Sequence, residues 1–167
     1  EAFENWEASQ QAAVRNEGLW KRLKPTQVES AGGATLKIRE DQSVLVSGSK
    51  PEKDIYTLRF NQVPPAARVL RVEVLPDDSL PQKGPGRAGN GNFVLTEVVA
   101  RVERMGAAAR PVAFRSARAN HEQSLAVDKN PYGRWSAASA IDRDAKGDYA
   151  GWAILREVGR ANQLQVE

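Results

Sequence analysis

The stretch Arg68-Val69-Leu70-Arg71-Val72-Glu73-Val74-Leu75 alternates apolar and charged side chains, and this alternation decides the fold class. In an extended chain Leu70, Val72 and Val74 share one face, whereas the charged residues between them share the other. A period of two is typical of a strand that buries one face and exposes its opposite face to solvent. The stretch therefore predicts a half-buried β-strand.

Outward from this stretch, the same period recurs in short segments separated by Gly, Pro, Asp and Asn. The longest candidate strand is 92–104, and its predicted inner face consists of Val94, Thr96, Val98, Ala100 and Val102. The other candidates are 35–39, 43–47, 55–60, a strand beginning at Val112 and Phe114, 152–155 and 163–166. Many short strands without βαβ alternation predict an all-β protein, and specifically a β-sandwich of the jelly-roll type.

The first residues follow a different period. Phe3, Trp6, Gln10, Ala13 and Val14 recur at helical spacing, so a short helix is expected from residue 2 to residue 14. We expect residues 1–18 to form this helix and a linker, and residues 19–167 to form one β-sandwich module. The abrupt start of the chain at residues 1–3 suggests a fragment of a longer protein.

Composition removes several classes of function. The 167 residues include no cysteine, which excludes disulfides, thiolate metal sites and a cysteine nucleophile. The formal charge of +3 is small and the basic residues are dispersed, so a nucleic-acid partner is not expected. No apolar run approaches the roughly 18 residues that a membrane helix needs, and membrane insertion is therefore not expected.

Catalytic signatures are also missing from the sequence. The single histidine, His121, has no serine elbow near it, and the sequence holds no HExxH motif, P-loop or GxGxxG fingerprint. The adjacent carboxylates Asp77 and Asp78 lie in a proline-rich loop, where such pairs commonly solvate a turn. We therefore expect a protein that is not an enzyme.

The loop from Leu75 to Asn92 is the first distinctive motif, because it is long and rich in glycine and proline. Arg87, Asn90 and Asn92 could donate or accept hydrogen bonds from the hydroxyls of a ligand. The loop could equally use these side chains to brace its own backbone, and both interpretations stay open.

A second motif, residues 140–154, is rich in aspartate. Oxygen ligands in irregular loops suit calcium, and Asp142, Asp144 and Asp148, with Glu167 at a strand end, are the candidate ligands. The alternative is an aspartate-rich turn that packs Trp152 into the core. The spacing does not match an EF-hand.

Aromatic residues supply the remaining candidates. Of the four tryptophans, Trp135 lies in loop-like sequence beside Tyr132 and Arg134, so it is the best candidate for a face on which a sugar ring stacks. The alternative is that Trp135 packs inside the protein.

Taken together, these segments resemble a known module. The similarity rests on the order of motifs from Trp20 to Ile154, and above all on the run Gly84-Pro85-Gly86-Arg87-Ala88-Gly89-Asn90-Gly91-Asn92-Phe93. The chain resembles a module of large extracytoplasmic planctomycete proteins that also carry cytochrome-c-like domains. One departure is Gln42, because the family pattern has glycine between the residues corresponding to Asp41 and Ser43. The resemblance implies a periplasmic or cell-surface location and a multidomain parent.

The segment from Ala140 through Asp142 to Gly151 and Trp152 is also similar to a motif of galactose-binding-like jelly rolls, which include discoidin-type and carbohydrate-binding modules. That similarity implies a structural calcium ion near the aspartate-rich turn and sugar-binding loops at one end. The chain as a whole has no Cys-x-x-Cys-His motif, so it cannot attach haem itself.

These observations lead to two functional hypotheses. The first is a non-catalytic carbohydrate-binding accessory module, with Trp135, Tyr132, Arg134, Arg87, Asn90 and Asn92 as the ligand-binding residues. The second is a structural module that docks neighbouring domains of the same chain without a small ligand. An exposed apolar face at Phe3 and Trp6 would favour the second.

Overall fold

The computed structural model describes residues 20–104, 106–120, 122 and 136–143, together with the backbone of 152–154 and 162–166. Within these residues the secondary structure consists of β-strands and two single-turn 3₁₀ helices, so the predicted all-β class is confirmed. The predicted N-terminal helix lies outside the described residues. The chain divides into two compact units, residues 1–65 and 66–167, and each is described by itself.

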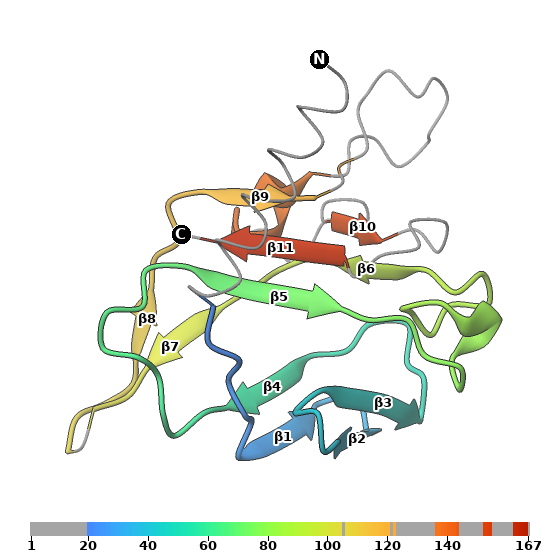
Figure 1. The fold of residues 1–167 in the computed structure, drawn as a ribbon, viewed down its shortest axis with the longest axis horizontal. Helices are drawn as coiled ribbons and strands as arrows, with labels where there is room; N and C mark the ends of the chain where they lie inside the picture. The colour runs from blue at the N-terminus through green and yellow to red at the C-terminus, as the bar shows by residue number, and fades with distance from the viewer. Residues whose placement is uncertain are drawn as a thin grey trace, which may run out of the picture. The chain divides into compact units, whose positions relative to one another are not determined.

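The described residues of unit 1 form two antiparallel pairs of strands (Figure 1). Strand β1 (Gln27–Ser30) pairs with β4 (Tyr56–Arg59), and β2 (Ala34–Ile38) forms a hairpin with β3 (Val44–Gly48). The alternation around Leu36 thus predicts β2 and β3 closely. Strand β1, by contrast, was not among the candidates, because its sequence Gln-Val-Glu-Ser has only one apolar residue.

A carboxylate joins the strand ends of unit 1. Asp54 precedes β4 and accepts hydrogen bonds from the hydroxyl of Ser30 (2.6 Å) and from the backbone amides of Gly32 and Ile55 (2.7 Å each). The Ser30 hydroxyl oxygen in turn accepts a hydrogen bond from the amide of Ala34 (2.8 Å). Asp54 therefore fixes the connection between β1 and β2 against the start of β4.

Unit 2 holds three antiparallel sheets among its described strands. Its largest sheet has the order β5 (Leu70–Val74), β11 (Asn162–Val166), β9 (Ala117–Ala119), so a strand from the end of the chain lies between two earlier strands. The other sheets pair β6 (Phe93–Leu95) with β10 (Trp152–Ile154) and β7 (Ala100–Val102) with β8 (Arg110–Val112).

The described core of unit 2 centres on a 3₁₀ turn, η2 (Ala137–Ala140). Ala137 and Ala140 are fully buried, and partly buried apolar side chains from β5, β6 and β9 pack against them, together with Val98, Phe114 and Ile141. Alanine leaves little volume between η2 and the strands, so the backbone of η2 can approach the strands closely. As predicted, the Leu70, Val72 and Val74 face of β5 points toward this core.

The prediction of one long strand over residues 92–104 is wrong. The segment forms two strands, β6 and β7, and between them the amide of Val98 donates a hydrogen bond to the carbonyl of Ala140 (2.7 Å). The predicted inner face is also wrong for β6, because Phe93 and Leu95 pack against the core while Val94 is 46% exposed. The strand expected to begin at Val112 instead ends there, and Phe114 packs in the core beyond it.

Candidate functional site

The loop between β5 and β6 folds into two successive turns. In the first turn, the amide of Leu80 donates to the carbonyl of Asp77 (3.0 Å), and the amide of Asp77 donates to the carbonyl of Gly84 (3.3 Å). A single 3₁₀ turn, η1 (Pro81–Lys83), closes it with a hydrogen bond from the Gly84 amide to the Pro81 carbonyl (3.0 Å). The long loop is therefore ordered by its own backbone.

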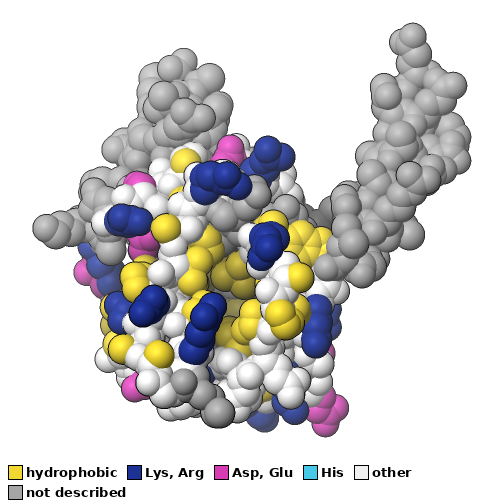
Figure 2. Space-filling view, turned by 90° about the vertical axis from the view of Figure 1, so that its left-hand side faces the viewer, with side chains coloured by type: hydrophobic (Ala, Val, Ile, Leu, Met, Phe, Trp, Pro, Cys, Tyr) yellow, Lys and Arg dark blue, Asp and Glu magenta, His cyan; other side chains and the backbone are white. Residues whose placement is uncertain are grey.

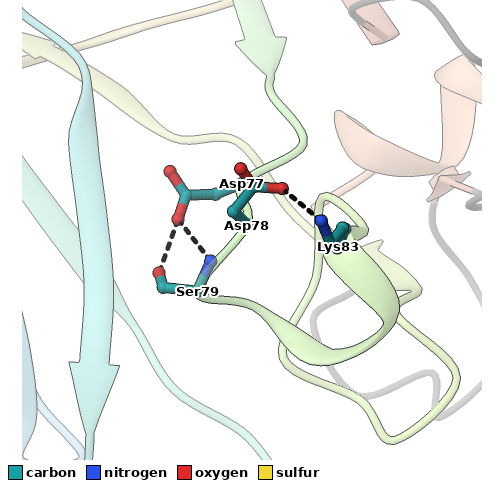
Figure 3. Close-up of polar contacts among 4 residues, drawn as sticks. All are labelled: Asp77, Asp78, Ser79 and Lys83. Carbon is teal, nitrogen blue, oxygen red and sulfur yellow. Dashed lines mark hydrogen bonds and ion pairs between the residues drawn. The ribbon is translucent and has the colours of Figure 1, made fainter.

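The side chain of Asp77 braces this first turn. Its Oδ1 accepts hydrogen bonds from both the amide (2.9 Å) and the hydroxyl (2.5 Å) of Ser79, as Figure 3 shows. The neighbouring Asp78 forms an ion pair with Lys83 (3.2 Å), but both side chains are strongly exposed. Exposed ion pairs contribute little to stability. The two aspartates thus differ: Asp77 holds the backbone of the turn, whereas the side chain of Asp78 lies in solvent.

The first turn contains two adjacent non-glycine residues in the left-handed backbone region. Gln82 has φ 56° and Lys83 has φ 53°. Left-handed conformations cost a non-glycine residue roughly 1–2 kcal/mol. Such conformations persist where the surroundings dictate them, and they are concentrated at binding and active sites. The hydrogen bonds on either side of this pair are what hold it.

The second turn brings three predicted ligand-binding residues together. The amide of Gly86 donates to the carbonyl of Gly91 (2.9 Å), and the amide of Gly91 donates to the carbonyl of Ala88 (2.8 Å). Arg87, Asn90 and Asn92 therefore lie in one closed stretch of chain, which we call the clamped turn (residues 86–92). Its closure fixes where these three side chains leave the backbone.

The clamped turn depends on close backbone approach. A Cβ atom placed on Gly84 would lie 2.4 Å from the carbonyl oxygen of Gly91, and one placed on Gly86 would lie 1.7 Å from that of Asn92. No side chain fits at either position, because the obstructing atoms belong to the backbone. Glycine is thus required at residues 84 and 86 for the geometry of the loop.

The three side chains differ in how they are used. Asn90 is exposed, and its Oδ1 accepts a hydrogen bond from the amide of Asn92 (3.1 Å). Arg87 and Asn92 are half-buried and make further interactions of their own. The loop therefore braces itself in part through a predicted ligand-binding residue, Asn90, which is itself exposed.

Most of the other candidates lie outside the described residues. These are Trp135, Tyr132, Arg134, His121, Asp144, Asp148 and Glu167. Asp142 is described and exposed, at the end of η2. Among the described residues, no three His, Cys, Asp or Glu side chains come together in a way that could hold a metal ion.

One positioning residue had no signal in the sequence. The carboxylate of Glu122 accepts a hydrogen bond from the amide of Ala137 (2.6 Å), and Ser136, beside it, is buried with its hydroxyl 3.1 Å from that of Ser139. Glu122 and Ala137 are 15 residues apart in a region with a weak periodic pattern. Only the folded chain shows that Glu122 holds the start of η2.

Comparison with protein-family models, with curated proteins and with solved structures finds no match to this chain. Within the part of the chain that the structure describes, no helix is long and apolar enough to cross a membrane.

Proposed function

We propose that this chain is a non-catalytic carbohydrate-binding module of a larger extracytoplasmic protein, built on a jelly-roll sandwich. The observation that supports this function best is the clamped turn, which gathers Arg87, Asn90 and Asn92 on a backbone closed by its own hydrogen bonds. Guanidinium and amide groups suit the vicinal hydroxyls and ring oxygens of sugars. The turn thus offers the polar half of a sugar site.

Preorganisation supplies the physical reason for a loop of this kind. A ligand that binds a flexible loop loses affinity to the entropy of ordering it, whereas a braced loop avoids most of that cost. The close glycine contacts and the Asp77–Ser79 hydrogen bonds order this loop without a ligand. Weak sugar contacts can then yield roughly micromolar to millimolar binding.

The aromatic half of the proposed site comes from the sequence. Trp135 and Tyr132 would provide the stacking face, with Arg134 beside them. A calcium ion held by Asp142, Asp144, Asp148 and Glu167 would brace the neighbouring turn.

The first test is a binding screen of the purified chain against algal and bacterial polysaccharides, by affinity gel electrophoresis followed by calorimetry. Each measurement is made with calcium and with a chelator. Retardation by a defined polysaccharide supports the proposal, and sensitivity to the chelator places the ion near the site. If no polysaccharide retards the chain, the proposal is contradicted.

Variants then locate the site. Arg87→Ala should weaken binding at least about tenfold, or about 1.4 kcal/mol. Asn90→Asp keeps the oxygen that accepts the Asn92 amide but removes the amide donors, so it separates binding from bracing. Trp135→Ala tests the stacking face. Arg59→Ala, an exposed arginine of β4 in unit 1, is the matched control. Equal binding by Arg87→Ala, Asn90→Asp and the control would refute this location.

A further inference from the structure

The hairpin formed by β7 and β8 is exposed except at Ala100, the half-buried first residue of β7. Every described residue from Arg101 to Ala113 is exposed, and Val102 retains 52% of its accessible surface. Val99, just before β7, is 67% exposed, and Val112 is exposed as well. A two-stranded hairpin alone is marginally stable in water. A third strand paired to the hairpin would therefore stabilise the hairpin.

The register of the hairpin places its valines together. Val102 lies opposite Arg110, and Ala100 lies opposite Val112. Directly opposed residues of an antiparallel pair share a face, so Val102 and Val112 are diagonal neighbours on one face of the hairpin. Two exposed valines and an arginine thus line a single face.

The two outer edges of the hairpin are not equivalent. Strand β8 has Pro111 at its centre, and proline has no N–H group to offer to a further strand. Strand β7 contains no proline, and within the described part of the chain it pairs with β8 alone. The β7 edge is therefore the one that can accept another strand.

Positive charge surrounds this edge. The exposed residues 101–113 include Arg101, Arg104 and Arg110, against the single acidic residue Glu103. In Figure 1 the hairpin lies on the left, the side that Figure 2 faces, where hydrophobic side chains lie among lysine and arginine side chains. The charge selects for a ligand with carboxylates.

We propose that β7 is a docking edge for an extended acidic peptide of a partner protein, which adds to the β7–β8 hairpin as a third strand. Strand addition would satisfy the outer backbone groups of β7, and alternate side chains of the peptide would lie beside Val102, on the face that Val112 also lines. Carboxylates on the other face of the peptide would form charge-assisted hydrogen bonds with Arg101, and the charge of Arg104, just beyond the end of β7, would add to the attraction. This surface is separate from the clamped turn, and the inference does not depend on sugar binding.

The test uses the purified chain and a fluorescein-labelled peptide of alternating glutamate and valine, with binding followed by fluorescence anisotropy. A lysine–valine peptide of the same length should bind at least about tenfold more weakly, because its charge has the wrong sign. The glutamate–valine peptide N-methylated at every residue should lose a similar factor, because it cannot donate backbone hydrogen bonds. The double variant R101E/R104E should also weaken binding about tenfold, whereas Arg59→Glu in β4 should leave it unchanged.

Three results would overturn the inference. Equal binding of the N-methylated peptide would rule out strand addition. Equally tight binding of dextran sulfate at the same residues would show a general surface for polyanions. Self-association of the chain that is lost in R101E/R104E would show that a second copy occupies this edge. The peptide comparisons involve no protein variant, so they remain decisive even if R101E/R104E fails to fold.

Discussion

The Cα atom of Gly86 lies against the backbone of Asn92 so closely that a Cβ atom on Gly86 would be 1.7 Å from the Asn92 carbonyl oxygen. This contact closes the clamped turn and sets the start of β6. Because the obstacle is backbone, it cannot move aside as a flexible side chain would. The glycine-rich run is thus a structural requirement before it is a binding motif.

Replacing Gly86 should therefore be costly. We expect Gly86→Ala to lower the free energy of unfolding by about 2–3 kcal/mol, as overpacking at a rigid site does. Gly89→Ala is the matched control, since its Cβ would meet no atom within 4 Å, and it should change stability by less than about 0.5 kcal/mol. Urea denaturation followed by circular dichroism gives both values. Equal stability of the two variants would show that the turn is not closed in this way.

The turn between β2 and β3 offers a stabilising substitution. Gln42 has φ 71°, a left-handed backbone conformation that favours glycine. Gln42→Gly should raise the free energy of unfolding by about 0.5–1 kcal/mol, because glycine adopts the left-handed region without steric strain. Gln27→Gly in the extended strand β1 should instead destabilise the protein by a similar amount. The midpoint temperatures of thermal unfolding of the two variants should shift in opposite directions. Shifts in the same direction would contradict the expected strain at Gln42.

The carboxylate of Asp54 should contribute more to the free energy of unfolding than any exposed acidic side chain nearby. Hydrogen bonds to a charged group contribute about 1.5–3 kcal/mol, and Asp54 accepts three of them from Ser30, Gly32 and Ile55. We expect Asp54→Ala to destabilise the protein by about 2–3 kcal/mol. The exposed Glu52→Ala should have almost no effect, so denaturant midpoints that fail to separate the two variants would argue against this role.

The pKa of Asp41 can be tested directly. Hydrogen bonds from the hydroxyl (2.7 Å) and the amide (3.0 Å) of Ser43 hold this pKa below its ordinary value of 3.8. A lowered native pKa means that the charged form is favoured by folding. Its contribution is therefore present above about pH 4 and is lost as the pH falls through the native pKa.

Ser43→Ala removes the larger of the two effects, so the pKa of Asp41 should rise toward 3.8. An NMR titration of the Asp41 carboxyl carbon measures the shift. Ser47→Ala is the control, because the Ser47 hydroxyl contacts the carbonyl of Thr35 and not Asp41. An unchanged Asp41 pKa in Ser43→Ala would show that the hydroxyl does not hold the carboxylate.

The candidate site was predictable only in part. The composition of residues 75–92 marked a long loop, and short-range hydrogen bonds within it bring Arg87, Asn90 and Asn92 into one turn. Whether Asn90 braces the turn or binds a ligand stayed open in the sequence, because an amide side chain has the same sequence signal in either role. The role of Glu122 had no signal, since it depends on a contact across 15 residues.

The sequence by itself determined the all-β class and the inward face of β5, because alternation at 70–74 depends only on the local geometry of an extended chain. The tertiary structure decided that β11 lies between β5 and β9, and that Ala137 and Ala140 form the buried centre. It also decided that β6 turns Phe93 and Leu95 inward, although both faces of that segment are apolar. Such choices rest on pairing between distant segments, and a periodic pattern carries no information about which segments meet.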